Sequence, residues 1–404
     1  MQDVMYNNMK QRFTVIGISD SQSPQFDAET MSVIASGTLF SGGRRHRELV
    51  AHLLPAGARW IEITVPLDDV FRQYEAYDHI IVFASGDPLF FGFGATLQRR
   101  LPDAEIVVCP VRNSLQHLAH RAVLPYGDMR TVSLTGREWR HLDRALLEGA
   151  SKIGILTDRE HTPAAIASRL LEYGYDGYEI IVGERLGNEL SETVRRLSLS
   201  EAAGMQFEMP NCVILSGTPR PVRFGLPESE FQLLDGRAGM ITKMPVRLTA
   251  LAAAELERAD TFWDIGFCTG SVSIEARLQF PRLQVVAFEI RPEGEQLMHE
   301  NARRFGALGI EAVIGDFLSV PLDKYPAPDA VFLGGYGGRL EEVVHRISRQ
   351  LRPGGRLVFN SVSDTSESGF LTAARHSGLT LAGRHRIVVD DHNPITVIKV
   401  IKPI

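Results

Sequence analysis

Cysteine, long apolar runs and excess positive charge are all scarce in this chain of 404 residues. Its three cysteines lie far apart and form no CxxC pair, which argues against a disulfide framework and a structural zinc site. No stretch approaches the roughly 18 uncharged apolar residues of a membrane helix. The N-terminus lacks a basic-then-apolar leader, so we expect a cytoplasmic protein. The formal net charge of −6 argues against a nucleic-acid binder held by bulk positive charge.

What the chain does contain is an ordinary globular composition, with 44% apolar and 23% charged residues. Such values exclude the disordered, collagen-like and coiled-coil classes. One domain usually takes about 100–200 residues, so the length predicts two large domains.

Residues 1–217 form the first expected domain, because strand-length apolar runs alternate there with segments of helical spacing. This alternation predicts a mostly parallel sheet covered by helices. Thr162 and Pro163 suit a helix start, with a hydroxyl N-cap followed by proline at the first helical position. The expected strands are Thr14–Ile18, Ile80–Ala84, Ile106–Cys109, Ile153–Leu156, Tyr178–Val182 and Cys212–Leu215, and the expected helices include Glu138–Leu147 and Pro163–Tyr173.

Residues 218–239 hold three prolines and several charges without a clear period, so we interpret them as an interdomain linker. Residues 240–404 form the second expected domain. Its expected strands are Thr261–Asp264, Gln284–Phe288, Ala312–Ile314, Ala330–Leu333, Arg356–Asn360, Arg386–Val389 and Ile395–Ile401. Its expected helices are Pro245–Glu257, Ser271–Gln279, Gly294–Phe305, Leu340–Gln350 and Thr365–His376, the last with a capping box of Asp364 and Glu367.

A glycine-containing turn after the first strand of the second domain is the strongest sign of a ligand site. Asp264, Gly266 and Gly270 lie between that strand and the next helix, where open α/β sheets bind nucleotide-like ligands. Glu289 and the Asp316-Phe317 pair follow the next two strands. Three acids at three successive strand ends predict a site for the amino acid, ribose and adenine parts of S-adenosylmethionine. The competing ligand is NAD, which prefers a G-x-G-x-x-G spacing that this loop lacks.

Four segments of the second domain resemble the decarboxylating half of the precorrin-6Y C5,15-methyltransferase family. They are Gly239–Lys243, Asp264–Gly270, Phe332–Gly335 and Asn393–Thr396. One departure is Cys268, which stands where the family usually has glycine. Its side chain could crowd the methionine part of the cofactor.

The segment Ala84–Gly94 of the first domain follows a strand and contains a sharp turn at Gly86, Asp87 and Pro88, with Leu89 next. This string resembles the tetrapyrrole methylases. The similarity extends to Ser41–His46, Pro110–Gln116 with Ser114, Ser133–Arg137, Leu156–Asp158 and Gly183–Gly187. Two departures are Gly17–Gln22, which replaces a Gly-x-Gly-Pro-Gly loop at the floor of the substrate cleft, and Thr135, which replaces a histidine.

The two resemblances together imply a tetrapyrrole-methylase fold of two α/β subdomains followed by a Rossmann-like, seven-stranded methyltransferase domain. They imply methylation of precorrin-6Y at C5 by the first half. The second half is implied to methylate C15 and to remove the C12 acetate carboxylate, in cobalamin biosynthesis. One S-adenosylmethionine site per domain, a tetrapyrrole partner and self-association through the second domain, with a tetramer as one form, are further implications.

A substrate with many carboxylates needs cationic contacts despite the net negative charge, and arginine forks match carboxylates well. Our predicted substrate contacts are Arg44, Arg45, His46 and Arg112 in the first domain, and Lys243 and Arg247 in the second. Lys243, Arg137 and Tyr336 are candidate catalytic residues. The alternative is that the basic segment after Gly43 is a solvated helix start and Lys243 an ordinary surface lysine.

Two other functions stay open at this point: an NAD-linked oxidoreductase, and a non-catalytic tetrapyrrole-binding protein with decayed cofactor loops. We expect no metal, nucleic-acid or membrane partner. The order of the two methylations, the presence of cobalt in the substrate and any channelling are not encoded in these motifs.

Overall fold

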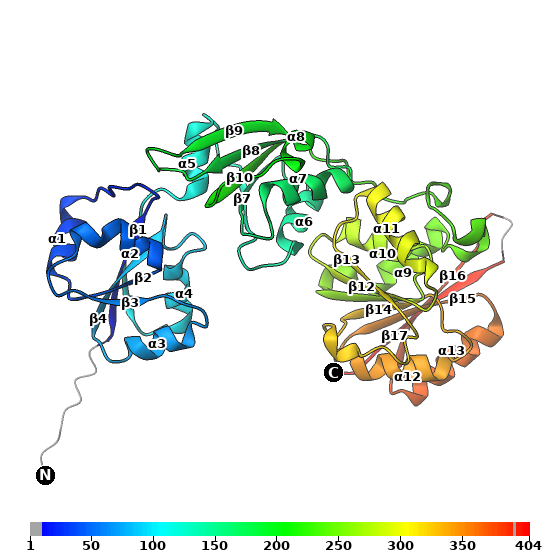
Figure 1. Ribbon diagram of the computed structural model, residues 1–404. Coiled ribbons are helices and arrows are strands. Elements are labelled where there is room, and N and C mark those ends of the chain that lie inside the picture. The colour runs from blue at the N-terminus through cyan, green and yellow to red at the C-terminus, as the bar shows by residue number, and fades with distance from the viewer. Residues whose placement is uncertain (1–9, 391–392) are drawn as a thin grey trace, which may run out of the picture. The chain divides into compact units, whose positions relative to one another are not determined.

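The computed structural model describes residues 10–390 and 393–404. By its internal contacts the chain divides into two compact units (Figure 1). Unit 1 takes the chain up to Arg137, together with residues 151–167 and 179–217. Unit 2 takes residues 138–150, 168–178 and 218–404. Within the described ranges, no helix is both long and apolar enough to cross a membrane.

The first sheet of unit 1 contains five parallel strands in the order β3-β2-β4-β1-β5. The central strands are buried on both faces, so they appear in the sequence as continuous apolar runs. The strands are β1 (Arg12–Ile18), β2 (Leu39–Gly42), β3 (Arg59–Glu62), β4 (His79–Ser85) and β5 (Glu105–Cys109). The helices here are α1 (Ala28–Ser36), α2 (Arg44–Val50), α3 (Asp68–Tyr74) and α4 (Phe93–Arg100), with the 3-10 turn η1 (Ala51–Leu53).

The second sheet has the order β6-β7-β10-β8-β9 and is mixed. β6 runs parallel to β7, whereas β7 with β10 and β8 with β9 are antiparallel, which departs from the parallel pattern we expected. Residues 185–192 are too short for a crossover, so β8 and β9 pair antiparallel. The strands are β6 (Arg130–Ser133), β7 (Lys152–Leu156), β8 (Tyr178–Glu184), β9 (Thr193–Ser198) and β10 (Asn211–Gly217). The helices are α5 (Ser114–Arg121), α6 (Arg140–Leu147), α7 (Pro163–Glu172) and α8 (Leu199–Ala203). Thr162 caps α7 as predicted, because its hydroxyl accepts the Ala165 N–H at 3.1 Å.

Unit 2 contains the expected seven-stranded sheet, in the order β13-β12-β11-β14-β15-β17-β16. Five strands are parallel, and β17 runs antiparallel to both β15 and β16. The strands are β11 (Thr261–Ile265), β12 (Gln284–Glu289), β13 (Ile310–Ile314), β14 (Ala330–Leu333), β15 (Arg356–Ser361), β16 (Thr380–Ile387) and β17 (Ile395–Ile401). The helices are α9 (Met244–Ala254), α10 (Ser271–Gln279), α11 (Glu293–Phe305), α12 (Leu340–Gln350) and α13 (Asp364–His376).

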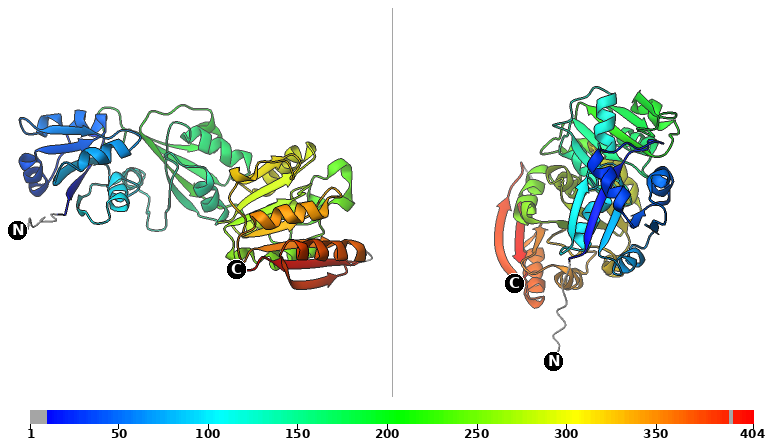
Figure 2. Two further views of the ribbon diagram at one scale, coloured as in Figure 1. Left: turned by 90° about the horizontal axis from the view of Figure 1, so that it is seen from below. Right: turned by 90° about the vertical axis from the view of Figure 1, so that its left-hand side faces the viewer.

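Helices cover both faces of this sheet, as two views show (Figure 2). α12 and α13 supply apolar side chains to one core cluster, and α9, α10 and α11 supply those of the clusters on the other face. The carboxyl ends of the five parallel strands therefore meet at one edge between the helix layers, where open α/β sheets bind ligands.

Two predicted element boundaries and one predicted helix cap in unit 2 were wrong. The first helix ends at Ala254 rather than Glu257, because Glu255 adopts a left-handed conformation (φ 50°). The capping box of α13 is formed by Ser363 and Ser366 rather than Asp364 and Glu367. β16 begins at Thr380, well before the predicted start. Two residues of the following connection, Asp391 and His392, lie outside the described residues.

The predicted linker packs against unit 2. Leu226 and Phe231 are buried in a core cluster together with residues of α10 and α11, and Leu234 is buried as well. The Glu275 carboxylate accepts the backbone N–H groups of Gly225 and Leu226 at 2.8 and 3.0 Å. The remaining 3-10 turns of the unit are η2 (Glu228–Glu230), η3 (Leu234–Gly236), η4 (Ala238–Met240), η5 (Leu256–Arg258) and η6 (Leu322–Lys324).

Candidate functional site

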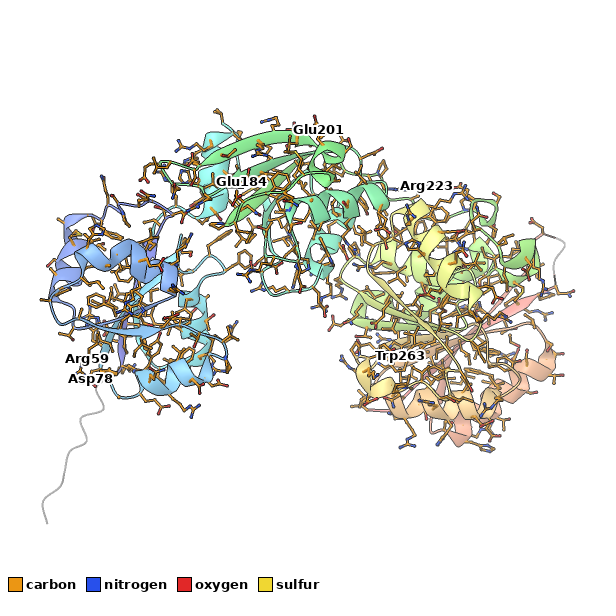
Figure 3. All side chains as sticks on the ribbon, in the orientation of Figure 1. Arg59, Asp78, Glu184, Glu201, Arg223 and Trp263 are labelled. Carbon is orange, nitrogen blue, oxygen red and sulfur yellow. The ribbon has the colours of Figure 1, made fainter. Side chains whose placement is uncertain are left out.

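A cavity of about 920 Å³ lies at the carboxyl ends of the parallel strands of unit 2. The fully buried Trp263, labelled in Figure 3, lies on the central strand β11, one residue before Asp264, which lines the cavity. Most of the residues predicted for this site line the cavity, from five different strands and loops. They are Lys243, Asp264, Gly266, Glu289, Asp316, Phe317 and Tyr336.

Asp264 has one carboxylate oxygen without a protein partner. Its Oδ2 accepts the Ser273 N–H at 3.1 Å and the Ser273 hydroxyl at 2.6 Å, whereas no described group bonds the buried Oδ1. Burial raises the pKa of this carboxyl to about 7. An unpartnered buried oxygen is costly unless a ligand supplies a donor. The ammonium of the S-adenosylmethionine amino acid part is such a donor, so Asp264 fits that cofactor.

The turn after Asp264 needs glycine at two positions. Gly266 (φ 75°) lies so close to Gly335 that a Cβ atom would come within 2.5 Å of the Gly335 nitrogen. Gly270 (φ 75°) precedes α10 and packs against Met298 instead of lining the cavity. Cys268 (φ 51°) does line the cavity, and burial raises the pKa of its thiol.

Glu289 is held rigidly at the end of β12. Its Oε2 accepts the Cys268 N–H at 2.9 Å, and its Oε1 accepts the Arg291 N–H at 3.0 Å and the Arg291 guanidinium at 3.2 Å. The residue is only 3% exposed. The carboxylate is therefore fixed beside the glycine turn, where it can accept hydrogen bonds from two ribose hydroxyls.

Asp316 lies just after β13, and its Oδ1 accepts the Leu318 N–H at 2.9 Å. Its other oxygen accepts the Arg339 guanidinium at 3.3 Å, and Arg339 also donates to Glu342. The neighbouring Phe317 is buried against Phe288, with ring centroids 5.2 Å apart. This wall suits the adenine ring, with an apolar face beside a hydrogen-bonding acid.

The cations around the cavity differ in how fully they are neutralised. Arg291 pairs with Glu289 and Arg339 with Asp316 and Glu342. Lys243, the N-cap residue of α9, forms no ion pair with any described residue. It is therefore the lining cation best placed to meet an anionic substrate.

Arg247 does not reach the cavity, contrary to our expectation. Both Arg247 and Glu275 have fully buried side chains, and their charged groups lie 3.3 Å apart. The Arg247 guanidinium also donates to the carbonyl oxygens of Thr242 and Leu226. Its role is to bind the segment before α9 to the core, so we withdraw it as a substrate contact.

Several lining residues were missed by the sequence reasoning, namely Arg291, Arg339, Asn360, Val362 and Ile395. The Asn360 side-chain oxygen on β15 is buried and has no described partner. Its position at the end of an expected strand, like that of the three acids, was a signal that could have identified it.

In unit 1 the predicted Gly86 turn packs directly against the end of β1. The Gly86 N–H donates to the Ile18 carbonyl at 2.8 Å, and a Cβ on Gly17 would lie 2.1 Å from the Gly86 oxygen. Asp87 closes the turn by accepting the Leu89 N–H at 2.9 Å. The turn continues through Pro88 to Leu89, which is 53% exposed. The tight approach fixes a turn with exposed backbone groups.

The start of α5 lies next to the same turn, because a Cβ on Gly86 would come within 3.1 Å of the Asn113 Cα. Asn113 caps α5 and forms a capping box with Gln116, so Ser114 occupies the first helical position. The structure thus places the Gly86 turn beside the start of α5, so the predicted cofactor residues Gly86, Asp87, Pro88 and Leu89 come from a segment that adjoins the one holding Ser114.

The basic residues of unit 1 lie in different environments. His46 bonds Ser85 at 2.9 Å, and burial lowers its pKa to about 4, so it is neutral. Arg44 points to Glu48 and its side chain is 83% exposed, as a solvated helix start would have it. Arg112 is exposed, and the Arg137 guanidinium lies 5.3 Å from the centre of the Phe91 ring. Arg45 pairs with Asp20.

Two family models match the chain. The model described as Tetrapyrrole (Corrin/Porphyrin) Methylases matches residues 38–203, and the model described as Precorrin methyltransferase domain matches residues 235–404. With the two α/β folds and the site described above, these matches define a methyltransferase built from two different methylase domains.

The curated relatives narrow the class. A precorrin-6Y C(5,15)-methyltransferase [decarboxylating] from Sinorhizobium sp is 32% identical over 362 residues, which cover 89% of this chain and 86% of the relative. A cobalt-precorrin-6B C(15)-methyltransferase (decarboxylating) from Salmonella typhimurium is 41% identical over 36% of this chain and 74% of its own length. A cobalt-precorrin-7 C(5)-methyltransferase from the same organism is 26% identical over 50% of this chain and 98% of its own length. The chain belongs to the precorrin-6Y C5,15-methyltransferase (decarboxylating) family.

Proposed function

We propose that this chain methylates precorrin-6Y at C5 and C15 and removes the carboxylate of the C12 acetate, in cobalamin biosynthesis. Residues 1–217 carry the C5 methylation, and residues 240–404 carry the C15 methylation and the decarboxylation. Family membership favours this function over an NAD-linked oxidoreductase or a non-catalytic carrier. The Salmonella relatives support the division, because two separate proteins there carry the C(15) and C(5) names.

The observation that carries the proposal is the arrangement of Asp264, Glu289 and Asp316 around one cavity, with Asp264 Oδ1 lacking a protein partner. Asp264 would hold the amino acid part of S-adenosylmethionine, Glu289 the ribose and Asp316 the adenine. A second cofactor site at Gly86, Asp87, Pro88, Leu89 and Ser114 gives one site per domain. When bound, the cofactor supplies an activated methyl group on sulfur.

The protein's part in methyl transfer is mainly positioning. S-adenosylmethionine held by these residues would supply its methyl group to a nucleophilic meso carbon of the macrocycle, with S-adenosylhomocysteine as the leaving group and the meso proton passing to solvent. Rigid groups that fix donor and acceptor in line supply most of the rate. Glu289, with three N–H bonds, and the close-packed Gly86 turn are rigid in this sense.

Decarboxylation needs different surroundings. The bond between the acetate methylene and its carboxylate breaks, the electron pair enters the conjugated ring system, carbon dioxide leaves and the methylene carbon takes a proton. An ion pair on the departing carboxylate would oppose this step. Arg291 and Arg339 are already neutralised by acids of the protein. Lys243 then binds a different carboxylate, and Tyr336 lines the wall beside the ring.

The test is incubation of the full chain with labelled S-adenosylmethionine and precorrin-6Y, followed by mass spectrometry. Two methyl gains and one loss of carbon dioxide are expected. A product with neither methyl gain would refute the function, and a single methyl gain would refute the assignment of one activity to each domain. A cytoplasmic location and self-association through the second domain stay predictions.

A further inference from the structure

Unit 1 holds a buried carboxylate that bonds two arginines, one on helix α2 and one in the loop after β8. Asp20 follows β1 in the loop where this sequence departs from its family, and it is 6% exposed. Arg45 of α2 donates to its Oδ1 at 2.5 Å, and Arg185, which follows β8, donates to its Oδ2 at 3.4 Å. One acid thus fixes two guanidinium groups that converge from opposite subdomains of the unit.

Counted by its direct ion pairs, this cluster carries one more positive than negative charge. Two cations meet one anion, and the side chains of Arg45 and Arg185 stay 40% and 38% exposed while Asp20 is covered. Two acids lie in the loop after Arg185. Glu192 already pairs with Arg121, and Glu189 bonds the Ser21 hydroxyl and the Gln22 N–H instead of either arginine of the cluster. Each guanidinium spends one N–H donor on Asp20 and keeps the others, so the pair presents fixed, unused donors suited to a carboxylate.

The cluster lies beside the turn proposed for the cofactor of the first domain. Ile18, two residues before Asp20, accepts the Gly86 N–H at 2.8 Å. His46, the residue after Arg45, bonds Ser85, the residue before Gly86. Both sides of the cluster are therefore anchored to the same turn, and a group bound by the arginines would lie close to the methyl donor.

Backbone conformation supports a special role for this place. Arg185 has a φ of 50°, a left-handed conformation that costs free energy in any residue but glycine. Glycine adopts this conformation without that cost, so it would be the favoured residue if no side chain were needed at this position. The loop that contains Arg185 makes a second contact with Asp20, because the Asn188 amide donates to the Asp20 carbonyl at 3.3 Å.

We propose that Asp20 is a positioning residue that holds Arg45 and Arg185 as a receptor for one carboxylate of the macrocycle during C5 methylation. This inference rests on the proposed function of the first domain. Asp20 acts through the two arginines, which touch the substrate, and not on the reacting atoms.

The experiment compares variants of the full chain with precorrin-6Y and carbon-13 methyl-labelled S-adenosylmethionine. Carbon NMR distinguishes the C5 and C15 methyl groups, so C15 methylation serves as an internal control. Asp20→Asn is expected to raise the KM for C5 methylation about tenfold, because freed arginines lose orientation. Asp20→Glu, which keeps the charge, is expected to restore most of the loss.

The matched control is Glu189→Gln. Glu189 bonds the Ser21 hydroxyl and the Gln22 N–H across the same two loops but pairs with no arginine among the described residues. The KM of the Glu189→Gln variant for C5 methylation is expected to match that of the wild type. Equal effects of Asp20→Asn and Glu189→Gln, with a lowered Tm, would overturn the proposal in favour of a purely structural tie.

A lower KM for C5 methylation in Asp20→Asn would also overturn the positioning role. The result would mean that removal of the negative charge improves substrate binding, whatever the orientation of the arginines. Absence of a C5 methyl group in the wild-type product would instead refute the proposed function itself. The two failures are therefore distinguishable in one set of spectra.

Discussion

The two units differ in the groups that form their proposed cofactor sites. In unit 2 the proposed cofactor site consists of side chains, with acids at the ends of three adjacent parallel strands and one buried Asp264 oxygen that has no described hydrogen-bond partner. In unit 1 the proposed cofactor site consists of backbone groups, where the Gly86 turn packs against Gly17. Positive charge differs as well, because the arginine pair of unit 1 keeps unused donors while the arginines at the unit 2 cavity are neutralised.

This difference teaches how each site can be damaged. A backbone site tolerates no added atom at its closest approach, whereas a side-chain site loses a ligand contact when one carboxylate is removed. Because the activities proposed for the two units belong to one chain, each variant carries its own control, which is the activity proposed for the other unit.

The largest expected effect is that of Gly17→Ala. The new Cβ would lie 2.1 Å from the Gly86 oxygen and 2.9 Å from the Val111 nitrogen, both backbone atoms, so the turn must shift. We expect C5 methylation to fall about a hundredfold, as misplacement by an ångström can cause, with C15 methylation kept. Carbon NMR of the product measures both. An unchanged C5 signal would show that the turn does not hold the cofactor.

Arg247→Met tests the reassignment of that residue to the core. The substitution leaves Glu275 buried with an uncompensated charge, which destabilises a protein by about 3 kcal/mol or more. We expect a lower midpoint of chemical unfolding for unit 2 and an unchanged KM for precorrin-6Y in the folded protein. A raised KM without loss of stability would return Arg247 to the substrate contacts.

The pH dependence of stability tests the buried state of Asp264. The pKa of Asp264 is about 7 in the folded protein, whereas its ordinary value is 3.8. Between pH 3.8 and about pH 7, the Asp264 carboxyl is therefore protonated in the folded state and ionised in the unfolded state. Stability therefore falls as pH rises from about 4 to about 7, by about 1.4 kcal/mol per pH unit at most. Unfolding of the wild type and Asp264→Asn at several pH values measures the difference, and parallel curves would contradict the assignment.

Asp264→Ala removes the unpaired oxygen itself. Loss of a hydrogen bond to a charged group should weaken cofactor binding in unit 2 about thirtyfold. Calorimetric titration with S-adenosylhomocysteine measures the affinity, and unit 1 should keep its own. Full affinity in both sites would mean that the amino acid part of the cofactor lies elsewhere.

The smallest effect concerns Cys268, which has a φ of 51°. Cys268→Gly relieves that conformation and should stabilise unit 2 by about 1 kcal/mol. The N–H group that bonds Glu289 is retained, so cofactor affinity should change less than about threefold. A large gain in affinity would show instead that the thiol crowds the cofactor.

The sequence was sufficient for the buried parallel strands and for the acids at their ends, because burial on both faces leaves continuous apolar runs. It was insufficient for β2 and β3, which have four residues each and give no clear run. The antiparallel β9 was missed because it alternates half-buried and exposed residues and carries Arg195 and Arg196.

The contacts that side chains make were harder to predict than the positions of helices and strands. Lys243 and Arg247 were predicted together as substrate contacts at the start of one helix. The Arg247 N–H does donate to the Lys243 carbonyl at 2.8 Å, yet only Lys243 lines the cavity, because the Arg247 side chain is fully buried with Glu275. The pairing of Asp20 with Arg45 and Arg185 joins residues 165 positions apart at its widest. No local pattern encodes such a contact, which depends on how two subdomains meet.

The most direct test of the account is the number of cofactor molecules bound by one chain. Titration of the intact wild-type protein with S-adenosylhomocysteine should show two binding events per chain, and Asp264→Ala should retain one. A single event in the wild type that survives unchanged in Asp264→Ala would contradict the claim that two unlike scaffolds bind the same donor.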